Sequence, residues 1–201
     1  MIELNNFTYK TNRILFEGAN FIAPSIGIIG IAGESGCGKT TFLKIISKQI
    51  HLDSMVNTAT SIFYGNQDAL LKKDLTIAQQ FELIESVYNR EHDQSTIDEL
   101  FNSLNIKANL SQKYDSCSLG EKKRIMIALS VYSNSPCIIL DEPLSSVDYE
   151  DKHSIMKLLK EHSHDRVIIL TIHDEEFDEY LDIKYLIENL QFIRIKDNES
   201  N

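Results

Sequence analysis

Residues 33–40 read Gly33-Glu34-Ser35-Gly36-Cys37-Gly38-Lys39-Thr40 and match the pattern G-x-x-x-x-G-K-[ST]. The apolar run at residues 26–31 precedes this stretch and predicts a strand, and apolar residues at helical spacing follow it from Phe42 onward. A glycine-rich loop between a strand and a helix is typical of sites that bind nucleotide phosphates. The stretch therefore predicts an α/β fold organised around a phosphate-binding loop.

The residue types in this loop meet separate requirements of phosphate binding. Glycines allow backbone conformations that are closed to other residues, so that consecutive N–H groups turn toward a di- or triphosphate. The helix expected from about Lys39 to Gln49 adds its N-terminal N–H groups to the same site. We expect Lys39 to contact the β- and γ-phosphates, the Thr40 hydroxyl to bind Mg²⁺, and Thr41 to complete the nucleotide-binding stretch.

Composition narrows the class of protein. The chain has 201 residues, with 42% hydrophobic and 25% charged residues, which favours one folded domain or one domain with a modest insertion. The net charge of −10 and the lack of a basic cluster argue against nucleic acid as a partner. Cys37, Cys117 and Cys137 are odd in number and lack metal-ligand spacing, so we expect reduced thiols in a cytosolic protein.

The order of patterns along the chain predicts alternating strands and helices. No apolar run approaches the length of about 20 residues that spans a bilayer, so contact with a membrane requires a partner. Strands alternating with helices predict an α/β core with a parallel sheet. The expected strands lie within residues 2–32, 61–64, 137–140, 167–171 and 183–195, and the expected helices within 39–49, 74–110 and 120–134.

Two carboxylates follow one of the buried strands. The run Cys137-Ile138-Ile139-Leu140 ends in Asp141 and Glu142, and ligands of open α/β sheets bind at the carboxyl ends of strands. We expect Asp141 to hold Mg²⁺, directly or through water, and Glu142 to act as the general base for an attacking water. The acid pair and the phosphate loop together predict nucleotide hydrolysis.

A third stretch lies between the phosphate loop and the acid pair, and here the sequence resembles one family. Residues 117–124 read Cys117-Ser118-Leu119-Gly120-Glu121-Lys122-Lys123-Arg124. They are similar to the signature L-S-G-G-Q-x-[QK]-R of the ATP-binding cassette (ABC) ATPases. Ser118, Gly120, Lys123 and Arg124 fit this signature, whereas Cys117, Leu119 and Glu121 depart from it.

Further matches to the family follow its motif order across nearly the whole chain. Tyr9 lies where the family has an aromatic residue that stacks on adenine, and Gln67 matches the glutamine that touches the metal and responds to the partner subunit. Residues 144–148 resemble the loop that follows the acid pair. His173 matches the histidine that contacts the γ-phosphate, and the resemblance implies that Glu142, His173 and Gln67 are the catalytic residues.

The resemblance also implies the fold and the cofactors. The fold is expected to be a P-loop NTPase core of the ABC type, which has a mostly parallel sheet with flanking helices, antiparallel strands at the N-terminus and an inserted helical subdomain. The cofactors are expected to be ATP and Mg²⁺. We expect one ABC ATPase domain over residues 1–201, with a core at 1–69 and 119–196, a helical subdomain at about 70–118 and a polar tail at 197–201.

In this family, two cassettes face each other head to tail, and each ATP lies between the phosphate loop of one and the signature of the other. Ser118 and Gly120 would therefore bind the ATP held by a second cassette, either a copy of this chain or a different one. The other expected partner is a separate membrane-spanning permease, which would place the chain in the cytoplasm on the inner face of the cell membrane. The sequence Ser118-Leu119-Gly120 resembles cassettes of antimicrobial-peptide export and immunity, which suggests a peptide exporter.

Two other functions remain open from the sequence. The chain could be the ATPase of an assembly complex without a membrane partner, since no residue pattern excludes this. It could also be a regulatory cassette that binds ATP without hydrolysis, because Leu119 and Glu121 change the signature. Because Lys39, Gln67, Glu142 and His173 are all present, we expect hydrolysis to be retained.

Overall fold

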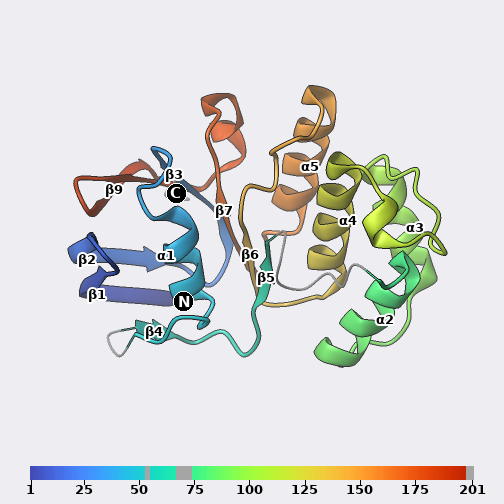
Figure 1. The fold of residues 1–201 in the computed structure, drawn as a ribbon, viewed down its shortest axis with the longest axis horizontal. Coiled ribbons are helices and arrows are strands. Elements are labelled where there is room, and N and C mark those ends of the chain that lie inside the picture. The colour runs from blue at the N-terminus through green and yellow to red at the C-terminus, as the bar shows by residue number, and fades with distance from the viewer. Residues whose placement is uncertain (53–54, 67–73, 198–201) are drawn as a thin grey trace.

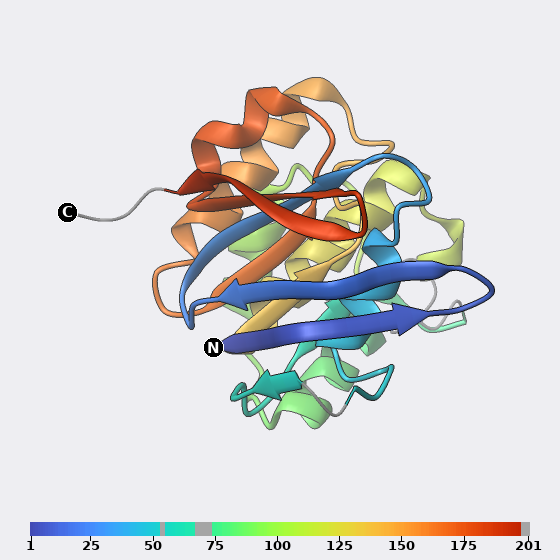
Figure 2. The ribbon, with the colours of Figure 1, turned by 90° about the vertical axis from the view of Figure 1, so that its left-hand side faces the viewer.

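The computed structural model describes residues 1–52, 55–66 and 74–197, and within them the strands form two sheets. The smaller sheet consists of β1 (Ile2–Lys10), β2 (Ile14–Ala23) and β4 (Met55–Asn57) in the order β2-β1-β4. Both pairings in this sheet are antiparallel. Figure 2 shows β1 and β2 as a long hairpin on the surface of the molecule, which confirms the predicted antiparallel strands at the N-terminus.

The larger sheet in the described part of the chain has six strands, in the order β5-β6-β7-β3-β8-β9. The pairings from β5 to β8 are parallel, and β9 runs antiparallel to β8. This mixed sheet confirms the predicted α/β class. Its strands are β3 (Gly27–Gly33), β5 (Phe63–Gly65), β6 (Cys137–Leu140), β7 (Val167–Thr171), β8 (Ile183–Glu188) and β9 (Gln191–Asp197).

The helices lie on both faces of this sheet and at one end of the molecule. Figure 1 shows α1 beside the N-terminal strands, α4 and α5 beyond β6, and α2 and α3 farthest from the N-terminal hairpin. The latter pair forms the predicted helical insertion. The α-helices are α1 (Lys39–Ile46), α2 (Ile77–Tyr88), α3 (Gln94–Ser103), α4 (Leu119–Tyr132) and α5 (Tyr149–Glu161), and the 3₁₀ helices are η1 (Tyr114–Ser116) and η2 (Glu175–Tyr180).

One hydrophobic core fixes α1 between the two sheets. Phe42 of α1 is fully buried and packs against Phe21 of β2 and Phe192 of β9, with ring centroids 4.7 Å and 4.4 Å apart. Buried aromatic rings contribute large apolar areas and prefer such tilted contacts. The core therefore holds the start of α1, and with it the phosphate loop, at a defined place on the sheet.

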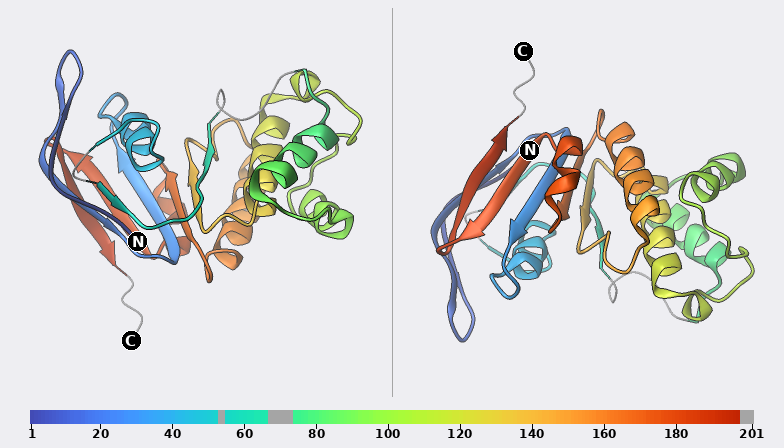
Figure 3. Two further views of the ribbon diagram at one scale, coloured as in Figure 1. Left: turned by 90° about the horizontal axis from the view of Figure 1, so that it is seen from below. Right: turned by 90° about the horizontal axis from the view of Figure 1, so that it is seen from above.

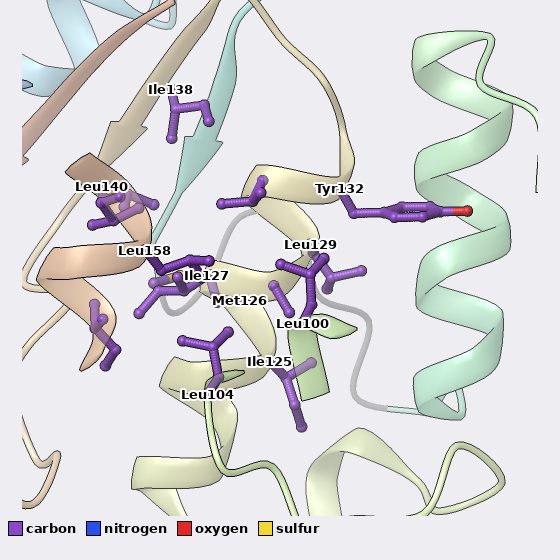
Figure 4. Packing of buried hydrophobic residues seen from close by; sticks show 14 of the residues in the cluster. Leu100, Leu104, Ile125, Met126, Ile127, Leu129, Tyr132, Ile138, Leu140 and Leu158 are labelled. Atoms are coloured by element: carbon purple, nitrogen blue, oxygen red, sulfur yellow. The ribbon is translucent and has the colours of Figure 1, made fainter. Parts of the chain in front are cut away.

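A second core joins the sheet to α2 and α3 through α4. Ile125 and Leu129 lie on one side of α4 and Ile127 on another, yet all three are fully buried, since residues 125–132 of this helix are covered on all sides. Figure 4 shows Tyr132 extending from α4 toward α2, where its hydroxyl donates to Glu85 Oε1 at 2.7 Å. The helical insertion is thus attached to the helix that carries the signature residues.

One helix boundary and one strand differ from the expectation. α1 ends at Ile46 rather than near Gln49, because Lys48 takes a left-handed conformation with φ 64° that cannot continue the helix. β4 was not expected, because its three residues gain their partners only by pairing with β1. No helix in the described residues is long and apolar enough to cross a membrane.

Candidate nucleotide-binding site

A cavity of about 490 Å³ lies over the phosphate loop. The structure brings Glu142 and His173 into its wall together with Lys39, although these residues are far apart in the sequence. Predicted nucleotide-binding and catalytic residues therefore meet at one place. The described residues that line the cavity are Thr11, Arg13, Leu15, Ser35, Gly36, Gly38, Lys39, Thr40, Thr41, Glu142 and His173.

The glycines of the loop are required by its backbone. Gly33, Gly36 and Gly38 have φ values of 147°, 78° and 113°, a region that residues with a Cβ rarely adopt. A Cβ at Gly33 would also lie 2.8 Å from Cys37 Sγ, and one at Gly38 would lie 3.1 Å from the Phe16 ring. The loop can therefore turn tightly around a ligand only with glycine at these positions.

The loop and α1 offer cationic and N–H donors to an anion. Lys39 is 8% exposed, and its Nζ donates to the carbonyl oxygens of Gly33 at 2.7 Å and Glu34 at 3.0 Å. The first turn of α1 contains no acidic residue, and its N-cap Gly38 provides no side-chain cap. Because the N-terminal N–H groups of a helix need acceptors, this end of α1 fits the phosphates of a nucleotide.

The acid pair is held in place by the neighbouring strands. Asp141 N–H donates to Gly65 O at 2.9 Å, so the hydrogen bonding between β5 and β6 continues to this residue. The Thr171 hydroxyl, at the end of β7, donates to Asp141 Oδ1 at 3.2 Å and accepts from Glu142 N–H at 2.6 Å. The carboxylate of Asp141 is thereby fixed at the carboxyl end of the sheet.

Lys123 of α4 holds the backbone of the acid pair. Its side chain is buried, and its Nζ donates to the carbonyl oxygens of Glu142 at 2.8 Å and Asp141 at 3.5 Å. Burial lowers the pKa of Lys123, while the nearby Glu142 and Asp141 act in the opposite direction. Glu142 itself has φ 51°, a strained conformation that these contacts stabilise. The signature match indicated Lys123, but not this contact.

His173 follows β7, is exposed and lines the cavity. It also lines a smaller cavity of about 90 Å³ that includes Glu142 and Lys152. Lys152 Nζ lies 3.1 Å from Asp174 Oδ2, so α5 contacts the segment that carries the histidine. The position of His173 therefore depends on both β7 and α5.

Ser118 and Gly120 do not line the cavity. In Figure 3, η1, which precedes α4, lies on the same side of the molecule as the β3–α1 loop but toward the opposite end. The Ser118 hydroxyl accepts from Glu121 N–H at 3.2 Å, and Glu121 Oε2 accepts from Ser118 N–H at 3.0 Å. This capping box begins α4. Leu119, beside it, is 62% exposed.

Four other predicted residues have different places. Tyr9 is half-buried against the core around α1, and it is not among the described residues of the cavity wall. Glu34 and Cys37 line a neighbouring cavity of about 250 Å³ instead. Gln67 lies outside the described residues. Sequence reasoning missed Thr11 and Arg13, because only the folded β1–β2 hairpin brings them to the loop.

The described residues at the site fit Mg²⁺ that binds together with a nucleotide. Within the described residues, no group of three or more His, Cys, Asp or Glu side chains could hold a metal ion. Mg²⁺ in nucleotide sites is commonly bound by one or two protein oxygens plus phosphate oxygens. The Thr40 hydroxyl and the Asp141 carboxylate fit that requirement by their chemistry and by their places at the loop and at the end of β6.

Similarity to known proteins agrees with this site. The family profile described as ABC transporter matches residues 16–145. The cytochrome c biogenesis ATP-binding export protein CcmA of Vibrio cholerae serotype O1 is 27% identical over 193 residues, which cover 88% of this chain and 93% of that protein. The protein of the same name from Reclinomonas americana is 30% identical over 189 residues, covering 87% of this chain and 85% of that protein.

A solved structure has the same fold. It is a dimeric ATP-binding cassette in a post-hydrolysis state, bound to ADP and Pi, with a TM-score of 0.80 and 21% identity over 98% of each chain. This likeness extends to the N-terminal antiparallel strands, the mixed sheet and the helical insertion. With the family match over residues 16–145, it establishes that the chain belongs to the ABC transporter family and is an ATPase, the ATP-binding subunit of such a transporter.

Proposed function

We propose that the chain powers transport by closing onto a second cassette around ATP and reopening after hydrolysis. The observation that supports this most is the separation of the site's parts. Lys39, Glu142 and His173 line one cavity, whereas Ser118 at the start of α4 does not reach it. One chain therefore provides each half of a nucleotide site, but in different places.

Within one chain, the residues have separable roles in the proposed reaction. ATP with Mg²⁺, when bound, supplies the phosphoanhydride bond and a cation that neutralises charge on its phosphates. Lys39 binds the β- and γ-phosphates, and Thr40 and Asp141 hold the metal. Glu142 accepts a proton from the attacking water, and His173 donates a hydrogen bond to the γ-phosphate. The contacts of Lys123 and Thr171 keep the acid pair in position.

The second cassette closes the site in this proposal. The Ser118 hydroxyl and the N–H groups at the start of α4 would donate to the γ-phosphate held by the other subunit. Gly120 also allows close packing of α4 within the chain, because a Cβ there would lie 2.9 Å from Ser146 O in the loop after the acid pair. Loss of the γ-phosphate then removes the contact between the halves, and the dimer opens.

The direction of transport and the membrane partner are finer points of the same proposal. Both relatives reported above are named ATP-binding export proteins, which supports export. We propose that a separate membrane-spanning subunit holds the chain at the inner face of the membrane. Neither relative is named for peptides, so the comparisons do not support a peptide cargo, and it stays a prediction.

The helical insertion is the proposed connection to that partner. We propose a single ABC domain in which residues 70–118 contact the membrane-spanning subunit. The Tyr132–Glu85 hydrogen bond supports this, because it joins α2 of the insertion to α4. Motion of α4 during closure would therefore move the insertion. We also propose that Gln67 responds to the partner subunit. Gln67 lies outside the described part of the chain.

The experiment is trapping of the closed dimer. Glu142→Gln keeps the shape of the side chain and removes the general base, so the variant should bind ATP without hydrolysing it. Size-exclusion chromatography of this variant should give a dimer with ATP and a monomer with ADP. Lys39→Ala in the same background is the control, and it should stay monomeric. A Glu142→Gln variant that binds ATP yet remains monomeric would contradict closure onto a second copy.

A further inference from the structure

Arg13 lies in the wall of the nucleotide cavity without belonging to any of the motifs described above. It ends the short turn between β1 and β2, where Thr11 N–H donates to Arg13 O at 2.9 Å. Figure 3 shows this turn on the same side of the molecule as the loop between β3 and α1. The hairpin thus reaches over the phosphate loop from a different sheet.

The guanidinium of Arg13 contacts the loop backbone directly. Its Nη2 donates to the carbonyl oxygen of Gly36, the glycine at the middle of the phosphate loop. A Cβ at Gly36 would lie 3.7 Å from the same nitrogen. Arg13 lines both the cavity of about 490 Å³ and the neighbouring cavity of about 250 Å³, so its side chain lies between them.

The charge of Arg13 has no counter-ion in the described part of the chain. The ion pairs found there involve other residues, and the one hydrogen-bond acceptor of the Arg13 side chain is the neutral carbonyl of Gly36. The residue is exposed at the cavity, and a guanidinium carries five N–H donors. Most of its donors are therefore available to a ligand.

Lys39 makes contacts of the same kind. Among the described residues, its Nζ also donates only to neutral loop carbonyls, those of Gly33 and Glu34. A phosphate oxygen is a stronger acceptor than a peptide carbonyl, because its charge strengthens and shortens the hydrogen bond. A phosphate that enters the cavity would therefore replace the carbonyl partners of both cations.

We propose that Arg13 is a second cationic residue that binds the phosphates of the nucleotide, in addition to Lys39. This inference rests on the proposed nucleotide site and adds a residue to it. A guanidinium can bind two phosphate oxygens through two parallel N–H groups of one rigid plane, a geometry that the ammonium of lysine does not provide. The hairpin would then contribute to affinity through charge at Arg13, while Tyr9 packs against the core.

The test compares variants of one hairpin. Arg13→Gln removes the charge, and Arg13→Lys keeps the charge but removes the planar guanidinium. Lys10→Gln is the control, because it removes a charge from an exposed residue that does not line the cavity. Isothermal titration calorimetry of each full-length variant would use ADP with Mg²⁺ and, separately, inorganic triphosphate. Thermal denaturation without ligand checks that each variant is folded.

The proposal predicts a loss of affinity for every ligand that carries the phosphates, with or without the base and ribose. Arg13→Gln should weaken binding of ADP and of inorganic triphosphate by about tenfold or more, as expected for a charged hydrogen bond. The affinity of Arg13→Lys for both ligands should lie between those of Arg13→Gln and the wild type. Lys10→Gln should bind both ligands as tightly as the wild type does. The affinity of Arg13→Gln for ADP should also depend less on salt.

Two results would overturn the proposal. One is an unchanged affinity of Arg13→Gln for both ligands, and the other is a loss for ADP with none for inorganic triphosphate, which would assign Arg13 to the base or ribose. Either result leaves the proposed function intact as long as the wild-type chain binds ADP and Lys39→Ala does not. A wild-type chain that binds no nucleotide would instead refute the proposed function.

Discussion

Gly120 is the residue at which the signature helix and the loop after the acid pair come closest. A Cβ there would lie 2.9 Å from the carbonyl oxygen of Ser146, a backbone atom that cannot rotate away. Ser146 has φ 61°, so its loop has little freedom to adjust. The two motifs are therefore in close contact within one chain.

Gly120→Ala should accordingly destabilise the protein. We expect the free energy of unfolding to fall by about 1–3 kcal/mol, as in other overpacked sites, and ATP hydrolysis to fall with it. Urea denaturation and a phosphate-release assay measure the two effects. Leu119→Ala is the matched control, because Leu119 is 62% exposed and its truncation should change the stability by less than about 0.5 kcal/mol. Equal stability of both variants would contradict the close contact.

The three thiols should differ in reactivity. Burial raises the pKa of Cys137 to about 12, and burial also raises the pKa of Cys117, whereas Cys37 is only partly buried in the phosphate loop. The thiolate is the reactive form. At about pH 8, far below its pKa, Cys137 stays protonated, and raising the pH to about 9 does not change this.

Alkylation with iodoacetamide followed by peptide mass spectrometry tests this order. The native protein should be modified first at Cys37, and ATP should slow that reaction because the phosphates cover the loop. Cys137 should react only after denaturation in urea. Modification of Cys137 in the native protein at about pH 8 would contradict its burial.

At the scale of elements, the start of α4 differs from the family signature in charge. The Glu121 carboxylate accepts the N–H of Ser118 and lies at the N-terminus of the helix. This position stabilises the free chain, since a helix N-terminus favours negative charge by about 0.3–1 kcal/mol. The same charge opposes the γ-phosphate that the proposed dimer would bring to Ser118.

Glu121→Gln should therefore lower stability slightly and favour closure. In the Glu142→Gln background, we expect half of the protein to be dimeric at a lower ATP concentration when Glu121 is also replaced. Analytical ultracentrifugation over a range of ATP concentrations measures this. Glu99→Gln on α3 is the control, because it changes the net charge equally on an exposed part of another helix. A higher ATP requirement for Glu121→Gln would show that the carboxylate does not oppose closure.

The elements also show which parts of the structure can be predicted from sequence. The phosphate loop, β6 with its acid pair, and β7 were predictable, because each depends on a local pattern of glycines or of continuous apolar residues. β4 was not predictable, since its Met55–Asn57 segment is a strand only through pairing with Ile2–Leu4 of β1. Arg13 was missed for the same reason, because its contact with Gly36 spans two sheets.

For the whole molecule, the arrangement separates two half-sites along its length. Figure 1 shows the phosphate-loop helix α1 and the signature helix α4 on different sides of β6 and β7. Neither half can be completed by the same chain, because α4 is fixed by the core that it shares with the sheet. The central claim is therefore that two chains complete each other's sites.

Mixing two inactive variants tests that claim most directly. Lys39→Ala should inactivate the loop half and Ser118→Ala the signature half, so either homodimer has a defect in both of its sites. In a mixed dimer, one site combines both defects and the other has none. Random mixing would give half mixed dimers and about a quarter of the wild-type ATPase rate, and this rate rises toward about half because Lys39→Ala forms few dimers with itself. An ATPase rate for the mixture that equals the sum of the separate variants would contradict a site shared between two copies.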